Sequence, residues 1–127
     1  MAKIMVVDDE ADFREMINLM LKKEGYETQM AKDGEDFLSK IDEFQPDLVT
    51  LDVLMSGLTT LEILKKLKEK KNNPKIILLT VVRYSDEEKK KILHMENIVD
   101  YATKPFDIDE LMVIIQKHIW ANNNHLK

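Results

Sequence analysis

Short, nearly continuous apolar runs recur along the chain. Residues 4–7, 48–51 and 76–79 are each almost entirely aliphatic, and a polar or acidic residue follows each run. Runs of this length are typical of strands buried on both faces of a parallel sheet. Two further strands are expected at 26–31 and 98–102. The run at 26–31 is weaker and alternating, which indicates a strand nearer an edge of the sheet.

Between these runs the apolar residues recur at helical intervals. The predicted stripes are Phe13, Met16, Ile17, Met20 and Leu21; Phe37, Leu38 and Ile41; Leu61, Leu64 and Leu67; and Ile108, Leu111, Met112, Ile115 and Ile119. Residues 59–62 and 85–88 have capping-box spacing, which marks the starts of two helices. The second of these, residues 86–95, is rich in lysine, so we expect it to be the most loosely packed helix.

Five repeats of strand then helix predict an α/β fold with a doubly wound, five-stranded parallel sheet. Right-handed crossovers and a weak second strand favour the strand order 2-1-3-4-5, the flavodoxin-like (βα)5 arrangement. We expect a single domain over residues 1–121 and a polar tail over residues 122–127.

Polar residues stand where four of the predicted strands end: Asp8 and Asp9, Asp52, Thr80, and Lys104. In the proposed strand order these ends adjoin one another, so three carboxylates, a hydroxyl and an ammonium group would converge. Three neighbouring carboxylates repel one another and call for a counter-charge. Oxygen ligands without a nearby histidine or cysteine favour Mg²⁺.

These groups suit phosphoryl transfer, in which positioning and charge neutralisation do most of the work. Asp52 lies on the most central of the acid-bearing strands, and a carboxylate can itself become an aspartyl phosphate. Lys104 and Mg²⁺ would neutralise the phosphoryl oxygens, and the Thr80 hydroxyl would bind one of them. Taken singly, an aspartate could cap the first helix and Thr80 could be an ordinary strand residue. Their coincidence at one sheet edge favours the functional interpretation.

Composition narrows the alternatives. The net charge of −5 and the lack of a basic stripe argue against a nucleic-acid groove. The chain has no cysteine, which excludes disulfides, thiolate metal sites and a cysteine nucleophile. The first apolar run is too short for a signal peptide or a membrane span, so we expect a cytoplasmic protein that does not bind a membrane.

The chain resembles the receiver domains of two-component response regulators, and is most similar to single-domain, chemotaxis-regulator-like members. The resemblance runs from Lys3 to about Trp120. It is carried by Val6-Val7-Asp8-Asp9, by Asp52 with Met55 three residues later, by Thr80, and by Lys104-Pro105 after a strand that contains Tyr101.

The resemblance implies that Asp52 takes a phosphoryl group from the phosphohistidine of a sensor histidine kinase or a histidine phosphotransfer protein. Asp9 would bind Mg²⁺ directly, Asp8 largely through water, and the backbone carbonyl of Leu54 would complete the protein ligands. Thr80 and Tyr101 would form a switch pair that alters the surface offered to a downstream effector protein. Such a protein catalyses its own phosphorylation and dephosphorylation without being a dedicated enzyme, and acts as a monomer or weak dimer.

This sequence departs from the receiver pattern at three positions. Ser56 and Thr60 occupy positions that usually hold proline and glycine, which predicts a differently turned loop after Asp52. Val81 stands where a small residue is usual, and its branched side chain is expected to narrow access to Asp52.

Several alternatives remain. The chain could be a phosphate-independent binding scaffold with a receiver-like fold, or a receiver excised from a larger regulator or hybrid kinase. A flavodoxin-like electron carrier is disfavoured because Asp8 and Asp9 would repel a bound phosphate. A haloacid-dehalogenase-type phosphatase is disfavoured because Leu54 stands where a second acid is normally found.

Overall fold

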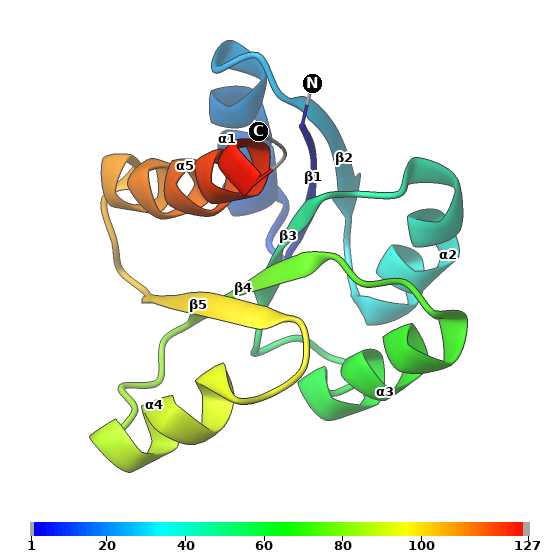
Figure 1. Cartoon of the computed structure of the whole chain (residues 1–127), viewed down its shortest axis with the longest axis vertical. Coiled ribbons are helices and arrows are strands. Elements are labelled where there is room, and N and C mark those ends of the chain that lie inside the picture. Colours follow the sequence, from blue (N-terminus) through cyan, green and yellow to red (C-terminus); the bar gives the residue numbers. More distant parts are fainter. Residues whose placement is uncertain (1, 126–127) are drawn as a thin grey trace.

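The computed structural model describes residues 2–125, within which five strands alternate with five helices (Figure 1). The strands are β1 (Lys3–Val7), β2 (Glu27–Ala31), β3 (Leu48–Asp52), β4 (Lys75–Thr80) and β5 (Ile98–Thr103). The helices are α1 (Ala11–Lys23), α2 (Gly34–Phe44), α3 (Thr60–Lys70), α4 (Asp86–Leu93) and α5 (Ile108–His125). All neighbouring strands pair in parallel, in the order β2-β1-β3-β4-β5, which confirms the predicted α/β topology.

Helices cover both faces of the sheet, as Figure 1 shows. Helices α1 and α5 bury one face, and α2, α3 and α4 bury the other. Successive residues of a strand point to opposite faces. Thus Met5 and Val7 of β1 pack under α2, α3 and α4, whereas Ile4 and Val6 pack under α1 and α5. This double burial is the reason why the strand sequences are continuously apolar.

Two of the predicted helical stripes are wrong in detail. In α1, Ile17 and Leu21 are buried, but the predicted core residue Met16 is 43% exposed. In α3, Leu61 is 65% exposed, and the buried positions are Ile63 and Leu67. Residues four apart share a helix face, whereas Leu61 and Ile63 are separated by about 200° around the helix axis.

Local capping signals define several helix ends as predicted. The side chains of Thr59 and Ser85 cap α3 and α4, and Glu62 and Glu88 complete the two capping boxes. Gly25 follows α1 with a φ of 91°, which a glycine adopts without strain. Helix α4 contributes a single buried residue, Ile92, in keeping with its predicted loose packing.

Helix α5 continues through His125 and so includes part of the segment 122–127 that was expected to be a polar tail; residues 126–127 lie outside the described residues. The position of the domain boundary stays a prediction. Across the part of the chain that the structure describes, no helix combines the length and apolar character that a membrane span requires.

Candidate functional site

Strand order brings Asp8 and Asp52 together. Strands β1 and β3 are neighbours in register, with Val7 opposite Leu51, and each strand leads directly into its aspartate. Asp8, Asp9 and Asp52 each offer one carboxylate oxygen, and these oxygens lie within 4.8 Å of one another. Asp8 and Asp52 are buried, and Asp9 is exposed at the rim. The predicted acidic cluster is therefore present.

Asp8 is held on every side by hydrogen bonds. Its Oδ1 accepts a bond from the backbone N–H of Glu10 at 2.9 Å, and its own N–H donates to the Ala31 carbonyl at 3.1 Å. The Arg14 guanidinium donates from Nη1 to the Asp8 carbonyl at 2.6 Å. The N-cap of α1 is Glu10, which makes no side-chain capping bond, so the aspartates do not serve as the helix cap.

Lys104 supplies the positive charge opposite the carboxylates. Lys104 directly follows β5, and its Nζ lies 3.2 Å from Oδ2 of Asp8 and 3.8 Å from Oδ1 of Asp52. The Lys104 side chain is only 17% exposed. One ammonium group therefore serves two buried carboxylates, which leaves the three-acid cluster short of positive charge.

The pKa of Asp52 is raised to about 6. Burial is the largest cause, and the neighbouring Asp8 and Asp9 charges also raise it. Lys104 and the Leu54 backbone N–H, which donates to Oδ1 at 3.2 Å, act in the opposite direction. Asp52 is thus predominantly ionised at neutral pH, in surroundings that favour an added cation.

The residues present fit a divalent metal. The ligand atoms are all oxygens, and a bound cation would relieve the mutual repulsion of the carboxylates. The cluster is therefore able to bind a metal ion. The Leu54 side chain is 56% exposed, while its N–H faces Asp52. Its carbonyl as a metal ligand stays a prediction.

Thr80 ends β4, and Tyr101 lies two residues before the end of the neighbouring strand β5. Thr80 pairs with Thr103, and Tyr101 pairs with Leu78. Tyr101 therefore lies two residues before the position opposite Thr80, and side chains two apart on a strand point to the same face of the sheet. Thr80 is fully buried, and its hydroxyl accepts a hydrogen bond from the Val82 N–H at 3.0 Å. Their role as a switch pair stays a prediction.

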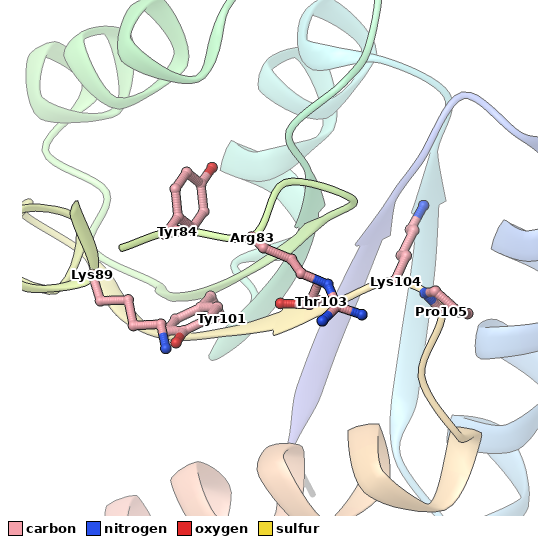
Figure 2. Close-up of a pocket in the computed structure, with 7 residues that line it drawn as sticks. All are labelled: Arg83, Tyr84, Lys89, Tyr101, Thr103, Lys104 and Pro105. Carbon is pink, nitrogen blue, oxygen red and sulfur yellow. The ribbon is translucent and has the colours of Figure 1, made fainter. Parts of the chain in front are cut away.

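Tyr101 lines a cavity of about 450 Å³ at the α4 side of the site. Figure 2 shows its other lining residues, Arg83, Tyr84, Lys89, Thr103, Lys104 and Pro105. The Lys89 ammonium lies 5.9 Å from the centroid of the Tyr101 ring. The cavity therefore combines aromatic rings with cationic side chains and adjoins the acidic cluster through Lys104.

Two residues of α1 that were not predicted to be part of the site also contact it. Arg14 binds the Asp8 carbonyl, and the ring of Phe13 contacts the Lys104 ammonium. Phe13 was assigned only to the apolar stripe of its helix. The sequence does show an aromatic and a basic residue soon after Asp8 and Asp9. Neither residue type, however, predicts which atom of another element it contacts.

Comparisons with known proteins agree with this geometry. Residues 4–116 match the family described as the response regulator receiver domain. The chemotaxis protein CheY4 of Vibrio cholerae is similar in structure, with a TM-score of 0.81 and 29% identity over 92% of this chain and 98% of that one. A Francisella response regulator receiver domain is similar with a TM-score of 0.80 and 31% identity, over 91% of this chain and 94% of that one. The response regulator TrrA of Thermotoga maritima was solved in complex with Mg²⁺ and BeF. It is similar with a TM-score of 0.74 and 39% identity, over 92% of this chain and 98% of that one.

Proposed function

The chain belongs to the response regulator receiver family, and from that premise we propose that Asp52 accepts a phosphoryl group and thereby switches a partner-binding surface. The donor is the phosphohistidine of a sensor histidine kinase or a histidine phosphotransfer protein. The observation that carries the proposal is the grouping of the Asp8, Asp9 and Asp52 carboxylate oxygens within 4.8 Å, beside the Lys104 ammonium.

Mg²⁺ is the cofactor that we propose for this site. Asp8, Asp9 and Asp52 would hold the ion, with the Leu54 carbonyl as a further ligand. When bound, Mg²⁺ supplies the positive charge that the acidic cluster lacks and that the phosphoryl oxygens require. The Mg²⁺ and BeF complex of the related TrrA supports this assignment.

The transfer is a displacement at phosphorus by a carboxylate oxygen of Asp52. Oδ1 of Asp52 accepts a hydrogen bond from the Leu54 backbone N–H and lies 3.8 Å from the Lys104 ammonium. Oδ2 of Asp52 has no hydrogen-bond partner among the described residues. We therefore assign Oδ2 as the nucleophile. A new O–P bond forms, the P–N bond of the donor breaks, and its electron pair stays on the imidazole nitrogen.

Lys104 and Thr80 stabilise the transferred group. The Lys104 ammonium lies beside Asp52 and neutralises charge on the phosphoryl oxygens. The Thr80 hydroxyl uses its oxygen to accept from Val82, so its proton is available to donate to a phosphoryl oxygen. Tyr101 is the residue we expect to respond, which would change the surface of α4, β5 and α5 that a downstream effector binds.

Intact mass measurement tests the assignment. The protein is incubated with Mg²⁺ and phosphoramidate, whose P–N bond is chemically similar to that of phosphohistidine. We expect a gain of one phosphoryl group that disappears with EDTA and in Asp52→Asn. Asp47→Asn is the matched control, because Asp47 lies just before the same strand but at its opposite end. No gain with either phosphoramidate or a histidine kinase, despite Mg²⁺ binding, would instead favour a phosphate-independent scaffold.

A further inference from the structure

The ammonium group of Lys104 lies against an aromatic ring as well as beside the carboxylates. Its Nζ is 4.2 Å from the centroid of the Phe13 ring, and 3.8 Å from Oδ1 of Asp52. A cation this close to a ring centroid is attracted by the negative face of the π system. The attraction is stronger when the cation is partly removed from water, and the Lys104 side chain is only 17% exposed.

The Phe13 ring is itself held by the loop that carries Lys104. Phe106, two residues after Lys104, meets Phe13 with ring centroids 5.7 Å apart and planes at 68°, an edge-to-face arrangement. Both phenylalanines are half-buried against the core under α1 and α5. The loop after β5 therefore contacts one ring of α1 at two points, through an ammonium group and through a second ring.

A lysine needs such support because its long side chain is flexible and its ammonium group is a compact point charge. Lys104 makes one close contact with a carboxylate, at 3.2 Å to Asp8, and a longer one to Asp52. Phosphorylation and metal binding would both change the charge of those carboxylates. The Phe13 ring does not titrate or bind metal, so neither change alters the ring that Lys104 contacts.

We propose that Phe13 is a positioning residue, whose ring face holds the Lys104 ammonium beside the phosphoryl-accepting carboxylate of Asp52. The proposal rests on the proposed function of Asp52 and Lys104, and adds a residue of α1 to it. It goes beyond the packing role that the apolar stripe of α1 implies, because a packing role requires only the volume of the ring, whereas positioning requires its π electrons.

Fluorination of the ring separates the two roles. Phenylalanine at position 13 is replaced by mono-, di- and trifluorinated analogues, which keep nearly the same shape but weaken the negative ring face. We expect the rate of phosphorylation by phosphoramidate to fall with each added fluorine, by about five- to tenfold over the series. Rates that stay constant across the series would overturn the proposal.

Ordinary substitutions provide a second comparison. Phe13→Leu should slow phosphorylation by about five- to tenfold, and Phe13→Tyr, which keeps the π face, should restore a rate within about twofold of the original. Phe44→Leu is the matched control, because it also removes a ring that contacts a lysine. The Lys3 ammonium lies 5.6 Å from the centroid of the Phe44 ring, and Lys3 begins β1, at the end of that strand opposite the acidic cluster. A similar loss in Phe44→Leu, or no rescue by tyrosine, would contradict a positioning role.

NMR of the protein without metal or phosphodonor tests the contact independently of activity. The ring current of Phe13 should shift the ε-methylene protons of Lys104 upfield, and Phe13→Leu should abolish that shift. If it is absent in the unmodified protein, the proposal fails. If it is present but the protein accepts no phosphoryl group, the proposed function fails while the contact stands.

Discussion

The ring of Tyr84 meets the ring of Tyr101 edge-on, with centroids 6.2 Å apart and planes at 83°. Tyr84 comes from the segment between β4 and α4, and Tyr101 comes from β5, so the contact joins the loop after Thr80 to the residue expected to switch with it. Both rings line the same cavity (Figure 2). The contact therefore stabilises the Tyr101 orientation seen here.

Removing this contact should loosen Tyr101. An edge-to-face aromatic pair contributes about 0.5–1.5 kcal/mol, so Tyr84→Leu should change the balance of Tyr101 orientations by roughly two- to tenfold. Tyr84→Phe keeps the ring and should leave the balance unchanged. Side-chain NMR of Tyr101 measures both variants. Identical Tyr101 signals in Tyr84→Leu and the unmodified protein would show that the ring contact is unimportant.

Asp52 should lower the stability of the metal-free protein at neutral pH. Its folded-state pKa is about 6, raised from 3.8, so ionisation is harder in the folded state than in the unfolded one. The resulting loss of stability develops as the pH rises from about 4 to about 6, and persists above that range. The Asp52 carboxylate also neutralises part of the positive charge of Lys104, and Asp52→Asn removes that favourable interaction. We therefore expect the substitution to stabilise the protein by only about 1–2 kcal/mol at pH 7.5.

Urea denaturation in EDTA between pH 5 and pH 8 measures this effect. The stability gained by Asp52→Asn should be largest at pH 7–8 and shrink toward pH 5. A gain that stays constant across this range would be inconsistent with a raised pKa.

Mg²⁺ should stabilise the folded protein through the acidic cluster. A ligand at one hundred times its dissociation constant adds about 2.7 kcal/mol to the free energy of unfolding. Asp9→Asn removes an exposed carboxylate from the cluster and should weaken Mg²⁺ binding by at least about tenfold, or ~1.4 kcal/mol. Calorimetric titration provides the affinities. Asp12→Asn, an exposed aspartate outside the cluster, should bind Mg²⁺ normally; equal loss in both variants would argue against a specific site.

Val81 should slow hydrolysis of the phosphorylated protein. It directly follows Thr80 and is 55% exposed, and we expect its branched side chain to narrow the access of water to Asp52. Val81→Ala should release phosphate faster, by less than about tenfold, or ~1.4 kcal/mol in the barrier. The decay of the phosphorylated mass over time measures the rate. Val113→Ala, at a comparably exposed valine of α5, should decay at the original rate; an unchanged rate in Val81→Ala would exclude the effect.

Gly34 is required by close packing between α2 and α3. A Cβ at this position would lie 2.7 Å from Cδ1 of Ile63 and 3.2 Å from Cβ of Leu58. Gly34→Ala should therefore destabilise the fold by about 1–3 kcal/mol. Ile63→Val removes the nearest methyl group, so the double variant should lose less stability than the two single variants summed. Urea denaturation of all three tests this, and simple additivity would mean that Ile63 does not limit the space.

Much of the fold could be predicted because its signals are local. The apolar runs of β1, β3 and β4 are long enough to identify buried strands, and the side chains of Thr59 and Ser85 start their helices as their spacing predicts. The helical stripes were less reliable. Leu61 fits an apolar period as well as Ile63 does, and only the position of α3 against the sheet decides which of them is buried.

The sequence by itself determined the sheet order and the meeting of Asp8, Asp9 and Asp52, because parallel strands place their carboxyl ends at one edge and each aspartate ends its strand or follows it within two residues. Only the tertiary structure decided how that cluster is supported. The contacts of Lys104 with Asp8 and with Phe13 join residues that are far apart in the chain, and they depend on how α1 packs beside the loop after β5. Periodicity places a side chain on a face of its own helix or strand, but its partner on another element is set by the packing of the whole domain.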